Sequence, residues 1–560
     1  MKCKVSDSLA MAKSNSKRWA WWAAWLASTA ITSWYGLPLF ASQFGIETAL
    51  SIPVIMPIAI GCGIAVLFLN DITQVDNPIQ RTFPVLYWGR KMAVGVGPLF
   101  RQYWFMADLD EKPFNRVTRN WVYKTAAGKS NNIGFGSQVD FDAVGSYHVL
   151  PTTFTDRSGT DKNTDDKGHY QLVIGKHTGI TNPVVMNHFV NISAMSFGSL
   201  SARAISALNI GAKKAGILHN TGEGGYSPYH QKGGGAIFQM GTAKFGVRKD
   251  DSSLDDDLMK KLAAHSDVKM IEVKLAQGAK PGKGGMLLKE KITAEIAAIR
   301  NVPMGQDVLS PRRHVEISNV DELFDFLDRV RKICDKPVGI KLVVGHTDEI
   351  EMIAEKMAAE PGRGPDYIAV DGSEGGTGAA PLVLASHAGL PMKQAIAVVD
   401  IALKEYGVRD RVALLSAGQM ATPIDVVVAM SLGADAVYIA RGFLLALGCI
   451  QALDCHSNHC PTGIATQDAK RQRALDVEGA SERVAMYAQA LQHEVMTLTK
   501  SCGYTSPSQF TADDVMVVTR PGHLDYLSEL QGVSAWEAAQ ERKQANAEGM
   551  TVGEWKRSKS

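Results

Sequence analysis

Short apolar and β-branched runs recur through the middle of the chain and alternate with segments of helical character. Eight runs end in small or polar residues, and they cover 190–195, 217–222, 236–241, 270–278, 338–343, 367–372, 412–418 and 436–441. Continuous apolar strands that alternate with helices indicate a parallel sheet covered on both faces. Eight such units over roughly 260 residues have the count and size of an α/β protein with a (β/α)8 TIM barrel. A doubly wound open sheet is the alternative. In a barrel, the active site lies at the carboxyl ends of the strands.

The amino-terminal 70 residues have a different pattern. Residues 19–40 contain no charge, and a second uncharged stretch covers 48–69. Each stretch is long enough to cross the hydrocarbon core of a bilayer, and basic residues precede the first and follow the second. This pattern predicts a transmembrane helical hairpin in the cell inner membrane, with the catalytic domain in the cytoplasm. A cleaved signal peptide and a buried core hairpin are the alternatives.

Changes in composition divide the chain into five parts. These are a basic tail (1–18), two membrane helices (19–70), a connecting region (71–165), the barrel (166–505) and a carboxyl-terminal extension (506–560). The net charge of +2 gives no indication of a nucleic-acid partner. Many of the 52 glycines lie in short loops, where the backbone is able to approach a ligand closely.

Three of the seven cysteines lie close together. Cys449, Cys455 and Cys460 have five and four residues between them, whereas the other four are scattered. This is not the pattern of a disulfide framework. The absence of such a pattern favours a reducing compartment for the catalytic part. Converging thiolates are the ligands of iron–sulfur clusters, and three of them suggest a [3Fe-4S] cluster or a fourth ligand from elsewhere. Zinc is the weaker alternative, because its sites usually contain short C-x2-4-C pairs.

Five motifs occur in a fixed order along the chain. They are NISAMSFGSLS, NTGEGG, KLAQGAKPGKGG, DGSEGGTGAAP and GCIQALDCHSNHCPTGIATQ. Their order and the cysteine spacing resemble the FMN-binding synthase domain of glutamate synthases, over residues 165–500. The resemblance implies an FMN-binding (β/α)8 barrel with a [3Fe-4S] cluster, which agrees with the barrel predicted from the strands.

The glycine-rich loop at 371–380 follows the sixth predicted strand and would present backbone N–H groups to a phosphate, together with the loops after strands seven and eight. Glycines that only permit tight turns are the alternative.

Lys341 ends the fifth strand, and the resemblance places this lysine beside FMN, where a cation stabilises the reduced ring. A surface lysine is the alternative, although a charge within GIKLVV fits it poorly. The predicted cofactor-binding residues are Ala194, Met195, Ser196, Gln277, Lys341, Asp371, Gly375, Gly376, Thr377, Gly378, Gly418, Gln419, Ala440 and Arg441.

Three residues are predicted to be catalytic. Lys280 and Arg300 are suited to bind substrate carboxylates, and the resemblance places both beside 2-oxoglutarate with Glu223 nearby. The alternative to a substrate-binding Arg300 is a side chain that lies in solvent at the end of a helix. The family's KPGEGGQ reads KPGKGGM here, so that Lys283 replaces an acid and Met286 replaces a glutamine that contacts 2-oxoglutarate. A thioether cannot donate the hydrogen bond of an amide, so Met286 leaves room for a substrate other than 2-oxoglutarate.

The resemblance implies a glutamate synthase-like oxidoreductase that reductively aminates 2-oxoglutarate to glutamate in ammonia assimilation. Electrons would enter through the cluster and pass to FMN. No glutaminase is recognisable, so the ammonia is expected to be free or to come from a separate glutaminase. No dinucleotide-binding motif is recognisable either, so a separate electron donor is expected, which would be ferredoxin-like or a reductase subunit. Two alternatives remain: a related enzyme acting on another amine, similar to glutamate N-methyltransferase, and a membrane flavoprotein that carries electrons.

Overall fold

The computed structural model describes residues 52–74, 77–137, 139–154, 163–530, 533–550 and 552–559. They belong to two compact units, one that ends at Glu111 and one that begins at Lys112. Each unit is described by itself.

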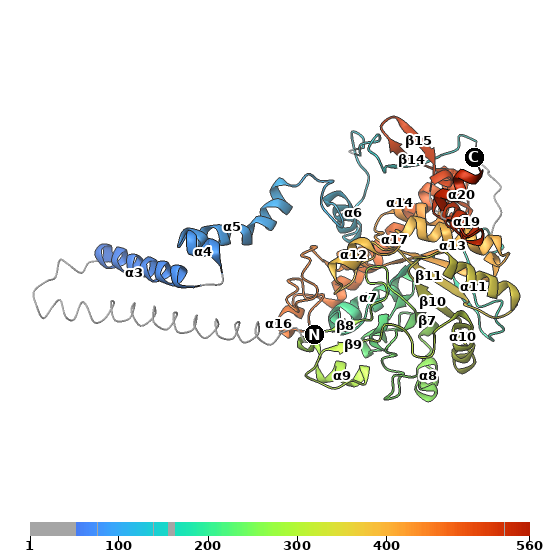
Figure 1. Cartoon of the computed structure of the whole chain (residues 1–560), viewed down its shortest axis with the longest axis horizontal. Coiled ribbons are helices and arrows are strands. Elements are labelled where there is room, and N and C mark those ends of the chain that lie inside the picture. Colours follow the sequence, from blue (N-terminus) through green and yellow to red (C-terminus); the bar gives the residue numbers. More distant parts are fainter. Residues whose placement is uncertain are drawn as a thin grey trace, which may run out of the picture. The chain divides into compact units, whose positions relative to one another are not determined.

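The first unit consists of helices in its described part (Figure 1). They are α3 (Ile52–Thr73), α4 (Pro78–Thr82), α5 (Leu86–Phe100) and the π-helix η2 (Arg101–Phe105). The carboxylate of Asp71, buried near the end of α3, accepts hydrogen bonds from Gln80 Nε2 at 2.6 Å, Val85 N at 2.8 Å and Trp88 Nε1 at 3.1 Å. This polar contact fixes the end of α3 to α4 and α5.

The predicted membrane hairpin needs correction. The first predicted span, 19–40, lies outside the described residues, and the second, 48–69, overlaps α3, whose last turn contains Asn70 and Asp71. A membrane-crossing helix requires about 20 consecutive apolar residues. None of the helices in the described part of the chain combines the length and the apolar character that a bilayer crossing requires. This finding contradicts the predicted location in the inner membrane.

The second unit contains a closed barrel of eight parallel strands, in the order predicted from the apolar runs. Each strand pairs in parallel with the next, and β13 pairs with β4 to close the barrel. The fold prediction is therefore confirmed for the barrel, and the open sheet is excluded. The strands are β4 (Val190–Ile192), β5 (His219–Asn220), β6 (Ala236–Met240), β7 (Val268–Lys274), β10 (Val338–Leu342), β11 (Tyr367–Asp371), β12 (Ala413–Ala417) and β13 (Ala436–Ile439).

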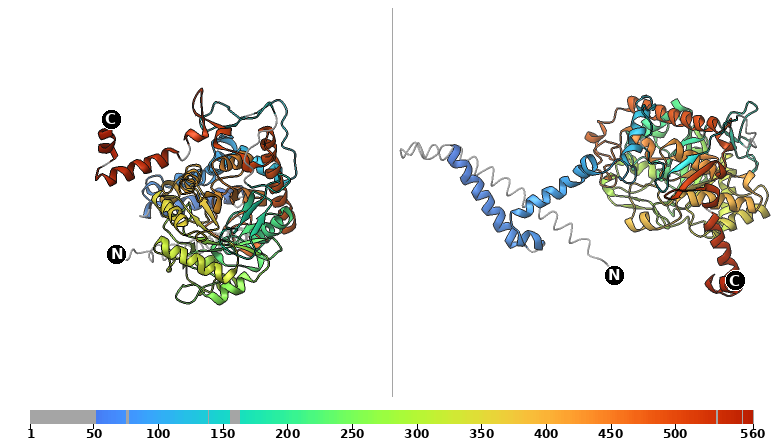
Figure 2. Two further views of the ribbon diagram at one scale, coloured as in Figure 1. Left: turned by 90° about the vertical axis from the view of Figure 1, so that its right-hand side faces the viewer. Right: turned by 90° about the horizontal axis from the view of Figure 1, so that it is seen from above.

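Helices surround the barrel strands (Figure 1, Figure 2). Their ends follow local signals, as in α7, where the Ser201 side chain accepts from Ala204 N and Gly216 ends the helix with a φ of +70°. The helices around the barrel are α7 (Ala202–Ala215), α8 (Asp256–Ala263), α9 (Ala294–Arg300), α10 (Val320–Cys334), α11 (Asp348–Ala359), α12 (Leu382–His387), α13 (Met392–Glu405), α14 (Pro423–Ser431) and α15 (Arg441–Leu447). Single 3-10 turns lie at η3 (Gly222–Gly224), η4 (Pro228–His230), η5 (Lys289–Lys291) and η6 (Arg409–Arg411).

Segments outside the barrel pack on it. The long helix α17 (Val477–Ser501) lies against α7, where a Cβ on Gly211 would lie 2.4 Å from Val484 Cγ1, so this close approach requires glycine. Strand β1 (Tyr147–Val149) pairs with β14 (Val515–Arg520), although more than 360 residues separate them in sequence. The remaining elements are α6 (Arg116–Ala126), β2 (Leu172–Ile174), β3 (Val184–Met186), β8 (Met286–Leu287), β9 (Val308–Leu309), α16 (Ala469–Gln472), η7 (Pro507–Gln509), η8 (Ala512–Asp514), β15 (His523–Tyr526), α18 (Leu527–Leu530), α19 (Val533–Ala547) and α20 (Val552–Lys559).

Candidate active site

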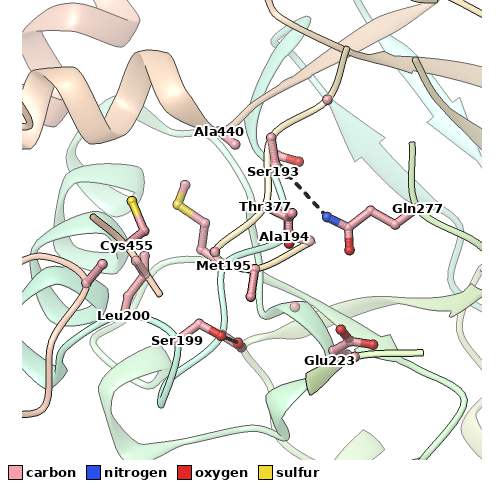
Figure 3. A pocket seen from close by; sticks show the side chains of 18 of the residues that line it. Ser193, Ala194, Met195, Ser199, Leu200, Glu223, Gln277, Thr377, Ala440 and Cys455 are labelled. Atoms are coloured by element: carbon pink, nitrogen blue, oxygen red, sulfur yellow. Dashed lines mark hydrogen bonds between the residues drawn. The ribbon is translucent and has the colours of Figure 1, made fainter. Parts of the chain in front are cut away.

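A cavity of about 330 Å³ lies at the carboxyl ends of the barrel strands. All the residues singled out in the sequence as catalytic, cofactor-binding or metal-binding contribute to its wall. Figure 3 shows Cys455 and Met195 on one side of this cavity and Gln277 and Glu223 on the other. The structure therefore brings the predicted residues together, while their roles stay predictions.

Glu223 is surrounded by cations. Its Oε1 lies 3.1 Å from Lys274 Nζ and 3.9 Å from Lys280 Nζ, and its side chain is 18% exposed. Burial alone would raise the pKa of Glu223, but the charges of Lys274 and Lys280 lower it to about 2. A Cβ on Gly285 would lie 2.6 Å from Oε1 of Glu223, and a Cβ on Gly241 would lie 2.7 Å from Cβ of Glu223. The side chain of Glu223 therefore has room only because both residues are glycines.

Arg300 is buried at the end of α9, which excludes the alternative of a solvated side chain. Its Nη2 donates to Phe197 O at 2.9 Å, and its guanidinium carbon lies 5.2 Å from the centre of the Phe245 ring. Burial lowers its pKa to about 10, against the opposing effect of Glu223. Its Nε has no hydrogen-bond partner among the described residues. Arg300 is thus a third cation near Glu223 with an unused donor.

Lys341 and Asp371 form a buried pair at the ends of β10 and β11. Lys341 Nζ lies 3.5 Å from Asp371 Oδ2, and both side chains are less than a tenth exposed. The same oxygen accepts from Gly278 N at 2.9 Å. Gln277 Nε2 donates to Gly376 O at 3.2 Å, which connects the loop after β7 to the glycine-rich loop after β11. Lys341 is not a surface lysine, so that alternative is excluded.

The loop 375–378 lies beside the half-buried guanidinium of Arg441. A Cβ on Gly378 would meet no atom within 4 Å, whereas a Cβ on Gly376 would lie 2.7 Å from Arg441 Nε. Arg441 Nη2 donates to Glu374 O at 2.7 Å, and burial lowers the pKa of Arg441. Exposed glycines next to a guanidinium suit a phosphate, so these residues fit the phosphate end of FMN.

The three cysteines lie in the wall of the cavity, and the sulfur atoms of Cys449 and Cys460 accept hydrogen bonds there. Gln451 N donates to Cys449 Sγ at 3.4 Å. Burial alone would raise the pKa of Cys460, but donors from Thr462, Ala465 and Ile464 lower it. Burial raises the pKa of Cys449 to about 11, and each of the other two thiols adds to this rise.

Hydrogen bonds to cysteine sulfur are among the features that tune iron–sulfur clusters, so this set of thiols fits a cluster. In the described residues, no three or more His, Cys, Asp and Glu side chains are grouped to hold a single metal ion. This finding covers the three cysteines as well, so it favours neither zinc nor an iron–sulfur cluster.

Sequence reasoning missed several residues of the cavity. Lys274 ends β7 and contacts both Glu223 and Gln277, the latter at 3.0 Å. A charge within the apolar run MIEVKLA is the same signal that identified Lys341 in GIKLVV, so the sequence did contain it. Pro113 also lines the cavity and gave no comparable signal, because it comes from the region before the barrel. The ring of its neighbour Phe114 lies 5.0 Å from the guanidinium carbon of Arg441.

Known proteins of similar sequence belong to one family. Residues 152–505 match the family model described as the conserved region in glutamate synthase. The glutamate synthase large subunit-like protein YerD of Bacillus subtilis (strain 168) is 38% identical over 491 residues, which cover 82% of this chain and 93% of that protein. The archaeal-type glutamate synthase (NADPH) of Thermotoga sp. (strain RQ2) is 38% identical over 317 residues, which cover 56% of this chain and 59% of that protein. The chain thus matches less than two thirds of the length of the Thermotoga protein.

Proposed function

The chain belongs to the glutamate synthase family, and we propose that it is an oxidoreductase acting on CH–NH2 donors that reductively aminates 2-oxoglutarate to glutamate. The amino group would come from free ammonia or from a separate glutaminase. A separate electron donor, ferredoxin-like or a reductase subunit, would supply the electrons.

The charge balance of the cavity carries this proposal. Lys274, Lys280 and Arg300 contribute three positive charges and Glu223 one negative charge, which leaves a net charge of +2 at this end of the cavity. A dicarboxylic 2-oxo acid has two negative charges, and Arg300 Nε is a buried donor without a partner among the described residues. Binding of one carboxylate at Arg300 and the other near Lys280 would satisfy that donor and neutralise the excess charge.

The remaining wall of the cavity supports two cofactors. FMN would be held by the phosphate-binding surface at 375–378 with Arg441, by Gln277 and by the Lys341–Asp371 pair. A [3Fe-4S] cluster would be held by Cys449, Cys455 and Cys460. When bound, these groups would supply hydride transfer and one-electron transfer, respectively. Lys280 and Arg300 would orient the substrate acid, and Glu223 would hold Lys274 and Lys280 in place.

The test uses the full-length chain purified anaerobically. It is supplied with 2-oxoglutarate, ¹⁵N-ammonium and dithionite-reduced methyl viologen, and glutamate is measured by mass spectrometry. We expect ¹⁵N-glutamate and a flavin spectrum. Lys280→Met should raise the KM for 2-oxoglutarate at least tenfold, because it removes a carboxylate-binding charge. The matched control is Lys283→Met, which changes an exposed lysine of the same loop. Protein with bound flavin but no glutamate product contradicts the proposal.

Met286 supports a second candidate, a reaction with another 2-oxo acid or amine. It is 38% exposed in β8 and lies in the cavity wall, where its thioether offers no hydrogen-bond donor. An apolar group in this position favours a less polar substrate than 2-oxoglutarate. The same assay with a panel of 2-oxo acids and with methylamine distinguishes the two candidates. A preference for another acid that Met286→Gln shifts towards 2-oxoglutarate would support the second.

A further inference from the structure

Lys291 is a buried lysine that joins the cavity wall to the cysteine loop, defined here as residues 449–465. It ends the 3-10 turn η5 and is only 4% exposed, whereas its neighbours Lys289 and Glu290 are exposed. Its Nζ donates to Cys455 O at 2.7 Å and to Ala465 O at 3.1 Å. A lysine is rarely buried without a partner, and here both partners lie in the cysteine loop.

The two carbonyl acceptors lie on either side of Cys460 in the sequence. Ala465 accepts from Lys291 through its carbonyl oxygen, and its N–H donates to the sulfur of Cys460. Lys291 thus bridges the peptide of Cys455 to a peptide that contacts Cys460. Loss of the ammonium would leave the buried carbonyl group of Ala465 and the half-buried one of Cys455 without this donor. A buried acceptor without a donor costs more than the net energy of an average hydrogen bond.

The charge of Lys291 also acts on the thiols. Its Nζ interacts electrostatically with Cys455 and Cys460 and with the nearby Asp454. In a buried environment with low dielectric constant, a positive charge stabilises whichever redox state of a nearby group is more negative. The reduction potential of an iron–sulfur cluster depends on net charge and hydrogen bonding around it.

We infer that Lys291 is a positioning residue for an iron–sulfur cluster on Cys449, Cys455 and Cys460. Its two hydrogen bonds hold the cysteine loop in shape, and its charge raises the reduction potential of the cluster. This inference rests on the cluster in the proposed function and not on the identity of the substrate.

The experiment compares three variants of the full-length chain, purified anaerobically with their cofactors. Lys291→Met removes the charge and the donors but keeps the length of the side chain, Lys291→Arg keeps the charge, and Lys289→Met is a matched change at an exposed lysine of the same turn. Iron and sulfide per flavin are measured, together with the midpoint potential from a dithionite titration followed by EPR. Hydrogen exchange of peptides within 455–465 is measured after the iron has been removed with a chelator.

We expect Lys291→Met to lose at least half of its iron per flavin and to shift the midpoint of the remaining cluster to more negative potential. Residues 455–465 should exchange at least tenfold faster than in Lys289→Met. Lys291→Arg should retain a midpoint close to that of the wild type. An unchanged flavin content in all three variants confirms that the barrel is folded.

Wild-type iron content and midpoint in Lys291→Met would overturn the inference, as would a wild-type protein that contains no iron. If the cluster responds as expected but the enzyme forms no glutamate, the proposed reaction fails and the role of Lys291 stands. The two failures are therefore distinguishable.

Discussion

The replacement Glu223→Gln tests the charge arrangement on which the proposed function depends. The carboxylate lies within 4 Å of two lysines, and its pKa of about 2 lies below the ordinary value of 4.5. This lowering of the pKa corresponds to about 3 kcal/mol in favour of the ionised form in the folded state. Because glutamine resembles the neutral acid, Glu223→Gln should lower the free energy of unfolding by about 3 kcal/mol at pH 7. Loss of one partner of a buried ion pair costs a similar amount, about 3–5 kcal/mol.

The sign of the pH dependence follows from the lowered pKa. The stabilisation by Glu223 is fully present above pH 4.5 and is lost as the pH falls through the folded-state value of about 2. The difference between wild type and Glu223→Gln should therefore be constant from pH 7 to pH 5 and should shrink below pH 4.5. Urea denaturation followed by circular dichroism at several pH values measures it.

A matched change isolates this effect. Glu290→Gln removes an exposed carboxylate in η5 and should change the free energy of unfolding by less than about 0.5 kcal/mol. A loss of less than about 1 kcal/mol in Glu223→Gln at pH 7 would refute the reasoning, and so would a difference that stays constant down to pH 3.

Three further changes test other parts of the site. Gly339→Ala should destabilise the barrel by about 1–3 kcal/mol in thermal unfolding, because its Cβ would lie 2.4 Å from the buried Tyr367 ring, whereas Gly345→Ala, with no atom within 4 Å, should have little effect. Arg441→Met should weaken FMN binding to the flavin-free protein at least tenfold in a fluorescence titration, and wild-type affinity would contradict its predicted contact with the phosphate. Cys455→Ser should abolish the EPR signal of the cluster while the flavin absorbance remains, and a retained iron signal would refute this ligand.

The barrel was predictable because its strands are buried on both faces. A strand covered by helices reads as a continuous apolar run, so β11 and β12 stand out in the sequence without reference to the rest of the fold. The position of the site follows from the same pattern, since the carboxyl ends of all eight strands meet at one end of a barrel. Local patterns therefore placed Lys341 and Asp371 correctly in the cavity wall.

Contacts between distant segments were not predictable in this way. The three-residue strand β1 is too short to produce a pattern, and it exists because β14 pairs with it. Phe114 packs on Arg441 across more than 320 residues of sequence. The inner-membrane prediction was wrong for a related reason: it rested on the hydrophobicity of segments read one at a time, and the described helices do not meet the requirements of a bilayer crossing.

The segment between β7 and α10 contributes residues to both of the proposed sites in the cavity. Met286 and Arg300 contact the end of the cavity near Glu223, and between them Lys291 contacts the cysteine loop. Only eight residues separate Lys291 from Arg300, and α9 (Ala294–Arg300) covers most of this interval. A displacement of this segment would therefore move together the charge of Arg300, which is proposed to bind the substrate, and the side chain of Lys291, which contacts the cysteine loop. Interior side chains are close-packed, so such a displacement is transmitted and not absorbed locally. It follows that Lys291→Met should alter the KM for the 2-oxo acid as well as the cluster, whereas Cys455→Ser should alter the cluster alone.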